Sequence, residues 1–296
     1  MKPAAFRYRR STSIDQCVDL LSKFDGEAKV LAGGQSLVPL MNLRLARPEV
    51  LIDINPVSEL SFIRSKDGVL ELGAMTRHVE VANSSVVLRS CPILAAAGKL
   101  IGYPAIRNRG TIGGSIAHAD PAAEMPCLAV ALDAELDVVS LRGSRTIAAA
   151  DFFRSHFTSA LEPSELLTSI RFRVPTTTEG WGFEEFARKQ GDFAVVAIAA
   201  GLTVDHGRIV RAAIAIAGAG DRPLRAAAAE AVLTDQAPSR DVISAAVEKI
   251  EEIAGEAQRS VGSVDEFRKR LAGVLGRRAV ESALADRASK DANNAE

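Results

Sequence analysis

"VLAGGQSLVPLM", at residues 30–41, places two adjacent glycines between a short apolar run and a segment that can begin a helix. A second stretch, "GTIGGSIAHADPAAEMP" at residues 110–126, repeats the order of an apolar residue, two glycines and small polar residues. Because glycine has no Cβ, such a turn can point successive backbone N–H groups at one anion, and a helix start behind it adds a favourable dipole. A plain turn explains most single glycine pairs, but two similar pairs in one chain favour a phosphate-binding role.

Composition limits the class of protein. With 296 residues, 47% of them hydrophobic and 25% charged, the chain can bury more than one core, so a multi-domain globular protein is expected. The formal net charge is -1, and no basic tract is interleaved with aromatic residues. Both features argue against nucleic acid or an anionic membrane surface as a partner.

Cysteine spacing and hydropathy predict the compartment. Cys17, Cys91 and Cys127 are widely separated and form no CxxC pair, which argues against a disulfide framework or a cysteine-ligated cluster. The first residues lack the apolar stretch of a signal peptide, and the longest strongly apolar run, at 194–202, is too short to span a bilayer. A cytoplasmic protein without membrane insertion is therefore expected.

Residues 1–59 form the first predicted lobe. Apolar residues at helical spacing behind the hydroxyls of Ser11 and Ser13 predict an amphipathic helix that ends at Gly26. A strand at 29–32 leads into the first glycine pair. The helix expected at 36–46 can hold Pro39 in its first turn, and "EVLIDI" at 49–54 predicts another strand.

Residues 60–176 form the second predicted lobe. "VLELGAMT" at 69–76 alternates as a half-buried strand does, and "AELDVVSL" at 134–141 predicts a further strand. Asp120 followed by Pro121 is typical of a helix start, so Asp120 is expected to cap a helix over 122–134. Strands that alternate with helices predict an α+β or α/β layer.

Residues 177–286 form the predicted C-terminal domain, which begins at a cluster of Pro, Thr and Gly at 174–180. Three antiparallel strands are expected at 182–187, 194–204 and 208–219, with a tight turn at 205–207 between the last two. Apolar residues recur at helical spacing over 241–254 and 264–284, which predicts two helices. Residues 287–296 carry little to bury and are expected to be a flexible tail.

Familiar catalytic and nucleotide-binding motifs are missing from the chain. It contains no GxGxxG, GxxxxGK[ST], HExxH or GxSxG, which disfavours Rossmann, P-loop, zinc-protease and α/β-hydrolase sites. The four histidines, His78, His118, His156 and His206, have no metal-ligand spacing. Neither a metal site nor a catalytic residue is expected on this chain.

Two stretches carry a resemblance to a known family. "AGGQSLVPLMNLRLARPEVLIDI", from Ala32, and "RNRGTIGGSIAHADPAAEMP", from Arg107, closely resemble the two FAD-binding signatures of the medium subunits of molybdenum hydroxylases, the xanthine dehydrogenase and aerobic carbon monoxide dehydrogenase family. The similarity continues into "RKQGDFAVVAIAAGL" and "GAGDRPLRAAAAEAVL", so it covers residues 3–284. It implies an α+β protein with a two-lobed FAD-binding fold of the vanillyl-alcohol-oxidase (PCMH) type. A C-terminal domain of a three-stranded antiparallel sheet and a helical bundle should follow.

The resemblance also assigns residues to the cofactor. It implies that the FAD diphosphate lies between two sets of residues, Ala32, Gly33, Gly34, Gln35, Ser36 and Leu37 on one side and Thr111, Ile112, Gly113, Gly114 and Ser115 on the other. Glu124 matches a position that holds a flavin-side or ribose hydroxyl, although an acid in the first turn of a helix would look the same. Ile101 matches a residue against the isoalloxazine, Leu167 one on the adenine and Phe193 one near the flavin, and core packing would explain each equally well.

The roles of Arg107, Arg109 and His118 stay open at this point. Both arginines can approach the diphosphate or serve as solvated charges, and only His118 of the histidines lies near a proposed site. The cysteine-rich insertion that binds an iron–sulfur cluster in hydroxybenzoyl-CoA reductases has no counterpart here.

The function implied by the resemblance is electron transfer. In such enzymes a large subunit carries the molybdopterin cofactor, a small subunit carries two [2Fe–2S] clusters, and FAD on the medium subunit passes electrons to an external acceptor. A dimer of heterotrimers is the expected assembly, and neither the substrate nor the acceptor follows from this chain. Two alternatives are a stand-alone flavin oxidase of the vanillyl-alcohol-oxidase type and a scaffold protein that has lost FAD.

Overall fold

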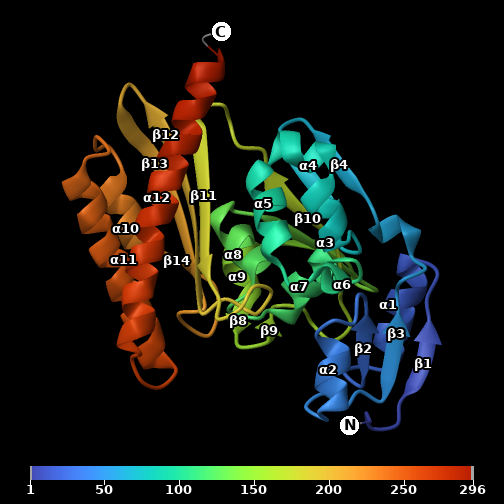
Figure 1. Cartoon of the computed structure of the whole chain (residues 1–296). Coiled ribbons are helices and arrows are strands. Elements are labelled where there is room, and N and C mark those ends of the chain that lie inside the picture. Colours follow the sequence, from blue (N-terminus) through green and yellow to red (C-terminus); the bar gives the residue numbers. More distant parts are fainter. Residues whose placement is uncertain (1, 295–296) are drawn as a thin grey trace.

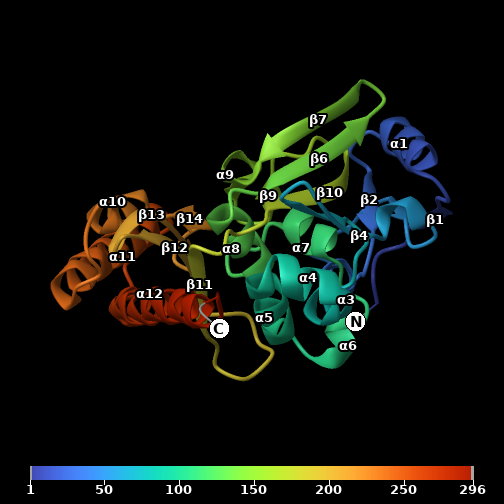
Figure 2. The ribbon, with the colours of Figure 1, turned by 90° about the horizontal axis from the view of Figure 1, so that it is seen from above.

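The computed structural model describes residues 2–294. Figure 1 shows a small N-terminal lobe, a larger middle lobe and a C-terminal sheet covered by helices. Seen from above in Figure 2, the middle lobe separates the other two parts. The predicted glycine turns belong to the N-terminal and middle lobes, so their meeting depends on how these two lobes pack.

The N-terminal lobe is built on a parallel sheet in the order β1-β3-β2, with β1 (Arg7–Arg10), β2 (Ala28–Leu31) and β3 (Val50–Asp53). Its helices are α1 (Ile14–Lys23), α2 (Leu37–Asn42) and the 3-10 turn η1 (Ser58–Leu60). The Ser13 hydroxyl accepts the N–H of Gln16 at 3.1 Å and so caps α1, as expected. One face of α1 buries Cys17, Val18 and Leu21 against the strands.

The middle lobe contains an antiparallel sheet in the order β4-β5-β10-β6-β7. Its strands are β4 (Ile63–Lys66), β5 (Val69–Gly73), β6 (Glu135–Ser140), β7 (Gly143–Ala148) and β10 (Leu166–Arg173), and β8 (Phe153–Ser155) pairs with β9 (Thr158–Ser159). Its helices are α3 (His78–Asn83), α4 (Ser85–Ser90), α5 (Pro92–Leu100), α6 (Pro104–Arg107), α7 (Ile112–His118), α8 (Glu124–Ala131) and α9 (Ala149–Phe152).

The start of α8 differs from the sequence prediction. Asp120 does not cap the helix, because α8 begins at Glu124 behind Ala123, and the Asp120 carboxylate instead accepts the N–H of Ala122 at 2.9 Å in a separate turn. The reason lies in Pro126. A helix that began at Pro121 would place Pro126 where a helical N–H is required, whereas a start at Glu124 keeps it in the first turn, where the N–H has no helical acceptor.

The C-terminal domain holds an antiparallel sheet in the order β11-β12-β13-β14. The three predicted strands are present as β11 (Glu179–Phe186), β12 (Val196–Asp205) and β13 (Arg208–Ala217), and a short fourth strand, β14 (Leu224–Arg225), was not predicted. Positive φ angles of 45° at His206 and 75° at Gly207 form the expected tight turn. One face of the sheet packs on α8 and the other on α10 (Ala227–Leu233), α11 (Arg240–Ser260) and α12 (Glu266–Asn294).

The expected flexible tail differs from the structure, because α12 continues to Asn294. The Lys290 ammonium donates to the carbonyl oxygen of Glu179 at 2.8 Å and to Asp286 Oδ2 at 2.7 Å. The bond to Glu179 holds the last turns of the helix on β11, whereas the bond to Asp286 lies within α12. Residues 295 and 296 of the expected tail lie outside the described part of the chain.

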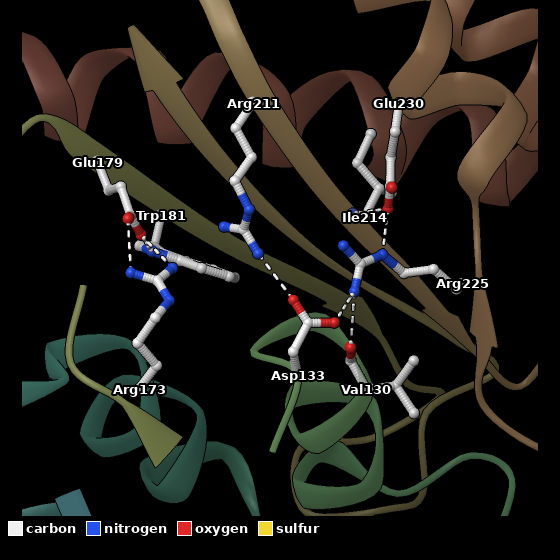
Figure 3. Close-up of polar contacts among 9 residues, drawn as sticks. All are labelled: Val130, Asp133, Arg173, Glu179, Trp181, Arg211, Ile214, Arg225 and Glu230. Carbon is white, nitrogen blue, oxygen red and sulfur yellow. Dashed lines mark hydrogen bonds and ion pairs between the residues drawn. The ribbon is translucent and has the colours of Figure 1, made fainter. Parts of the chain in front are cut away.

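Ion pairs fix the C-terminal sheet to the middle lobe (Figure 3). Asp133, just after α8, accepts Arg211 Nη2 at 2.7 Å and Arg225 Nη1 at 2.5 Å, and Arg225 also donates to the Val130 carbonyl at 3.0 Å. Arg173 at the end of β10 forms a two-point contact with Glu179 of β11, at 2.7 and 2.8 Å. The two parts therefore have one defined orientation.

Candidate functional site

The first glycine turn follows β2 and leaves a run of backbone donors free. Gly34 adopts a φ of +74°, which favours glycine, and its carbonyl accepts the N–H of Val38 at 3.1 Å. Within residues 2–294, no protein acceptor takes up the N–H groups of residues 33–37. Such a run of unpaired N–H groups on one turn can bind the oxygens of a phosphate.

The second glycine turn is built differently. Thr111 caps α7 and its Oγ1 accepts the N–H of Gly114 at 3.0 Å, while Gly113 donates to the Ala74 carbonyl at 2.9 Å. The N–H groups of Ile112 and Ser115 are also bonded within the protein. Of residues 111–115, Thr111 alone keeps an N–H without an acceptor in the described chain. The two turns are therefore not equivalent, and the first supplies most of the backbone donors.

The two turns meet through backbone contacts. A Cβ added to Gly33 would lie 2.3 Å from the carbonyl oxygen of Arg109 and 2.8 Å from Gly110 Cα. A Cβ added to Gly113 would lie 2.5 Å from both Cβ and the carbonyl oxygen of Ala74. Side chains at either position would push the turns away from their neighbours. The arrangement fits a dinucleotide diphosphate, because free N–H groups lie where two turns pack without intervening side chains.

Three residues that the sequence analysis missed join these turns. Asn55 Nδ2 donates to the Ala32 carbonyl at 2.9 Å, and its Oδ1 accepts Arg77 Nη2 at 2.7 Å. Arg77 Nη1 donates in turn to the Arg109 carbonyl at 2.5 Å, and Asp53 Oδ1 accepts the Asn55 N–H at 2.9 Å. A signal did exist for two of them. Asp53 ends β3, the central strand of the parallel sheet, and Asn55 follows on the next loop, at the edge where ligands of such sheets bind.

Glu124 occupies the first position of α8 and is only 5% exposed. Burial raises the pKa of its carboxyl group to about 8, and the nearby carboxylates of Glu185 and Asp120 act in the same direction. At neutral pH the group is therefore mostly a neutral carboxylic acid, which can donate as well as accept a hydrogen bond. A first-turn acid that served only the helix dipole would need to be ionised.

The other predicted contacts lie around the junction of the turns. Ile101 is buried, and its carbonyl accepts Arg107 Nη1 at 2.9 Å, so Arg107 is tied to the loop before α6. Leu167 is buried in β10 opposite Val138. The next residue, Thr168, accepts the backbone N–H of Ala74 with its carbonyl oxygen. Phe193, in contrast, is 61% exposed in the loop between β11 and β12. A purely core-packing role is therefore excluded for Phe193.

Two histidines flank the second turn. His78 lies beneath it, so that a Cβ on Gly110 would come within 2.9 Å of its ring. Burial and the charge of Arg107 lower the pKa of His78 to about 4, which leaves it neutral at pH 7. His118 stacks on Phe157 with ring centroids 4.9 Å apart, and burial lowers its pKa as well. Both rings support the polypeptide around the turn.

Residues 2–294 contain no group of three or more His, Cys, Asp or Glu side chains that could hold a metal ion. None of the helices in this part of the chain is both long and apolar enough to cross a bilayer.

Comparison with known families covers nearly the whole chain. Residues 4–177 match the family described as the FAD binding domain in molybdopterin dehydrogenase, and residues 181–283 match the CO dehydrogenase flavoprotein C-terminal domain. The carbon monoxide dehydrogenase medium chain of Afipia carboxidovorans is 39% identical over 285 residues, which span 96% of this chain and 99% of that protein. Subunit alpha of the 6-hydroxypseudooxynicotine dehydrogenase complex of Paenarthrobacter nicotinovorans is 43% identical over 249 residues, 83% of each chain.

Solved structures agree with these matches. Carbon monoxide dehydrogenase from Hydrogenophaga pseudoflava superposes with a TM-score of 0.93 at 37% identity, covering 97% of this chain and 99% of that one. Quinoline 2-oxidoreductase from Pseudomonas putida 86 gives a TM-score of 0.88 at 35% identity, covering 98% and 99%. The predicted family resemblance and the predicted fold, an α+β chain with a PCMH-type FAD-binding part and a C-terminal sheet-and-helix domain, are confirmed.

Proposed function

The chain belongs to the family of FAD-binding flavoprotein subunits of molybdopterin dehydrogenases, and from this premise we propose that it is the electron-transfer subunit of a multi-subunit molybdenum hydroxylase. When bound, FAD supplies the redox chemistry, taking electrons from [2Fe–2S] clusters of a partner subunit and delivering them to an external acceptor. The observation that carries the proposal is the junction of the two glycine turns, with free N–H groups at residues 33–37.

Each part of the chain has a distinct task in this proposal. The first turn binds the diphosphate through its N–H groups, and Thr111 and Ser115 face it from the second turn. Glu124 offers a neutral carboxyl group to a hydroxyl of the cofactor, whereas Ile101 and Leu167 provide apolar walls for its two ring systems. We assign no catalytic acid, base or nucleophile to this chain, and we keep residues 1–59, 60–176 and 177–286 as its lobes and C-terminal domain.

The partners in the proposed assembly are a large molybdopterin-binding subunit and a small [2Fe–2S] subunit, with two heterotrimers forming a dimer. The medium chains of carbon monoxide dehydrogenase and nicotine 6-hydroxylase among the relatives support a multi-subunit enzyme. The three cysteines of the chain are free thiols, which supports a reducing cytoplasm as its location. Substrate choice belongs to the large subunit.

The purified chain is expected to be yellow and to lose its visible absorption when dithionite is added. It should not turn over an aldehyde, a purine or an N-heterocycle, because the site holds a cofactor but no substrate-activating groups. Absorption spectra with and without each substrate provide the measurement. Steady substrate oxidation by the chain alone would favour the stand-alone oxidase, and a colourless chain that cannot be loaded with FAD would favour a scaffold protein.

The loop between β11 and β12 is expected to contact the iron–sulfur subunit. It contacts the residue before α6, because a Cβ on Gly191 would lie 3.1 Å from the Tyr103 ring. Phe193 of the loop is 61% exposed, and Tyr103 is 53% exposed. Aromatic side chains and arginine are enriched at protein interfaces, and Arg188 of this loop is exposed, as is the neighbouring Lys189.

Amine cross-linking of the native complex measures this contact. Lys189 should react with the iron–sulfur subunit, whereas Lys249 on α11, on the helical side of the C-terminal sheet, should give few such products. Cross-links to the small subunit that avoid this loop altogether would contradict the proposed interface.

A further inference from the structure

We propose that Asn55 and Arg77 are positioning residues that set the spacing of the two glycine turns and thereby the affinity of the chain for a dinucleotide diphosphate. This inference rests on the proposed function. It concerns two side chains outside both glycine stretches, one on the loop after β3 and the other immediately before α3.

The hydrogen bonds form one continuous bridge. From the first turn, the Ala32 carbonyl accepts Asn55 Nδ2 at 2.9 Å, and Asn55 Oδ1 accepts Arg77 Nη2 at 2.7 Å. From the second turn, the Arg109 carbonyl accepts Arg77 Nη1 at 2.5 Å. One side-chain amide and one guanidinium group thus connect the backbones of both turns.

The bridge is anchored at both ends. On the N-terminal lobe, Asp53 Oδ1 accepts the backbone N–H of Asn55 at 2.9 Å and its Nδ2 at 2.5 Å, and Tyr8 donates its hydroxyl to the same carboxylate. On the middle lobe, the backbone on either side of Arg77 is bonded to the second turn. The backbone N–H of His78 donates to the Gly110 carbonyl, and the backbone N–H of Ile112 donates to the Thr76 carbonyl, each at 3.0 Å.

No other polar link holds the turns together in the described chain. Within residues 2–294, no hydrogen bond runs directly between residues 32–37 and residues 107–115. Their direct contact is the close packing of Gly33 on Arg109 and Gly110. Packing prevents the turns from approaching further, whereas the bridge prevents them from separating. Both limits are needed to keep donors at hydrogen-bonding distance from one ligand.

The charges at the bridge also favour an anion. Burial lowers the pKa of Arg77, and the positive charge of Arg109 lowers it further, although Glu80 and Asp53 act in the opposite direction. The positive charges of Arg77 and Arg109 therefore lie close enough to repel each other, next to the junction of the two turns. A diphosphate bound there would relieve their repulsion, which ties the geometry of the bridge to occupancy of the site.

The test compares Arg77→Lys and Asn55→Asp with the unaltered full chain. Lysine keeps the positive charge but lacks the planar guanidinium that donates to the Arg109 carbonyl and to Asn55 Oδ1 at the same time. An aspartate at position 55 has no N–H in its side chain and cannot donate to the Ala32 carbonyl. Each change should raise the Kd for FAD by about 10- to 100-fold, as expected when one or two bridging hydrogen bonds are lost. Titration with FAD and with ADP measures whether both diphosphate ligands lose affinity by the same factor.

Arg145→Lys serves as the matched control. Like Arg77, Arg145 donates from its guanidinium to a side-chain oxygen and a backbone carbonyl, at 2.7 Å to Glu165 Oε1 and 3.0 Å to the Ala160 oxygen, but it lies on β7. Its replacement should leave the Kd for FAD unchanged. In addition, guanidinium chloride below denaturing concentrations should restore part of the FAD affinity of Arg77→Ala, a recovery that general destabilisation would not produce.

The outcomes separate this inference from the proposed function. If the unaltered chain fails to bind FAD, the proposed function is wrong. If it binds FAD, and Arg77→Lys and Asn55→Asp bind FAD as tightly as it does, the bridge does not position the turns. The inference would also be overturned if Arg77→Lys and Arg145→Lys lost FAD affinity to the same extent. The same holds if guanidinium chloride failed to restore any FAD affinity to Arg77→Ala. Should one variant fail to fold, the other variant and the recovery experiment decide.

Discussion

Gly33→Ala is expected to remove FAD from the chain, with a rise in Kd of at least about 100-fold, or about 2.7 kcal/mol. The added Cβ would lie 2.3 Å from the Arg109 carbonyl oxygen, a separation that real Cβ atoms do not show, and the obstacle is backbone that cannot rotate away. The two turns must then separate, and the N–H groups of residues 33–37 lose their position relative to the second turn. Absorbance of the purified variant and titration with FAD measure the loss.

Gly98→Ala is the control for this change. A Cβ on Gly98, in α5, would meet Ala82 Cβ at 3.5 Å, which is ordinary van der Waals contact, so the same chemical change should leave FAD binding intact. Gly113→Ala should act like Gly33→Ala, because its Cβ would meet Ala74 at 2.5 Å. If purified Gly33→Ala and Gly113→Ala each retained one FAD per chain, the diphosphate would have to bind elsewhere.

Glu124→Gln is expected to stabilise the chain without cofactor at alkaline pH. The pKa of Glu124 is raised by burial from 4.5 to about 8, so its contribution to stability is fully present below pH 4.5 and is lost as the pH rises towards 8. Glutamine resembles the neutral acid and does not ionise. The variant should therefore unfold with a free energy about 4 kcal/mol higher than the parent at pH 8, and with a difference below about 1 kcal/mol at pH 5. Urea unfolding at the two pH values measures this.

Glu165→Gln provides a control of opposite sign. Burial alone would raise the pKa of Glu165, but the hydrogen bonds and charge of Arg145 outweigh it and hold the pKa below 4.5. Its ionised form therefore stabilises the fold above pH 4.5, and this contribution is lost as the pH falls through the lowered pKa. Glu165→Gln should destabilise the chain at pH 8. A Glu124→Gln variant whose stability difference does not change with pH would show that Glu124 is ionised in the folded chain.

Much of the local structure could be predicted from the sequence. The Ser13 cap and the apolar spacing behind it define α1, and two apolar runs on either side of a tight turn at 205–207 define the hairpin of β12 and β13. These features depend on residues within a few positions of one another, whose backbone sterics and side-chain periodicity the sequence displays directly. The glycine pairs belong to the same class, because the turn at Gly34 needs a positive φ angle.

Features that depend on distant residues were missed or misplaced. The two residues of β14 exist because β13 offers a free edge, and α12 extends to Asn294 because Lys290 reaches the carbonyl of Glu179. The two glycine turns also differ for a tertiary reason. The carbonyl of Ala74, a residue 39 positions earlier and immediately after β5, accepts the N–H of Gly113, and no local sequence pattern predicts that bond.

Local sequence is enough to place two glycine turns in the chain, because glycine sterics act within a single turn. The tertiary structure alone places Gly33 against Arg109 and joins the two turns through Asn55 and Arg77. It also decided that Glu124 is buried among other acids and therefore neutral. Such properties depend on the distances between elements that packing brings together, and burial and charge shift a pKa only once those distances are set.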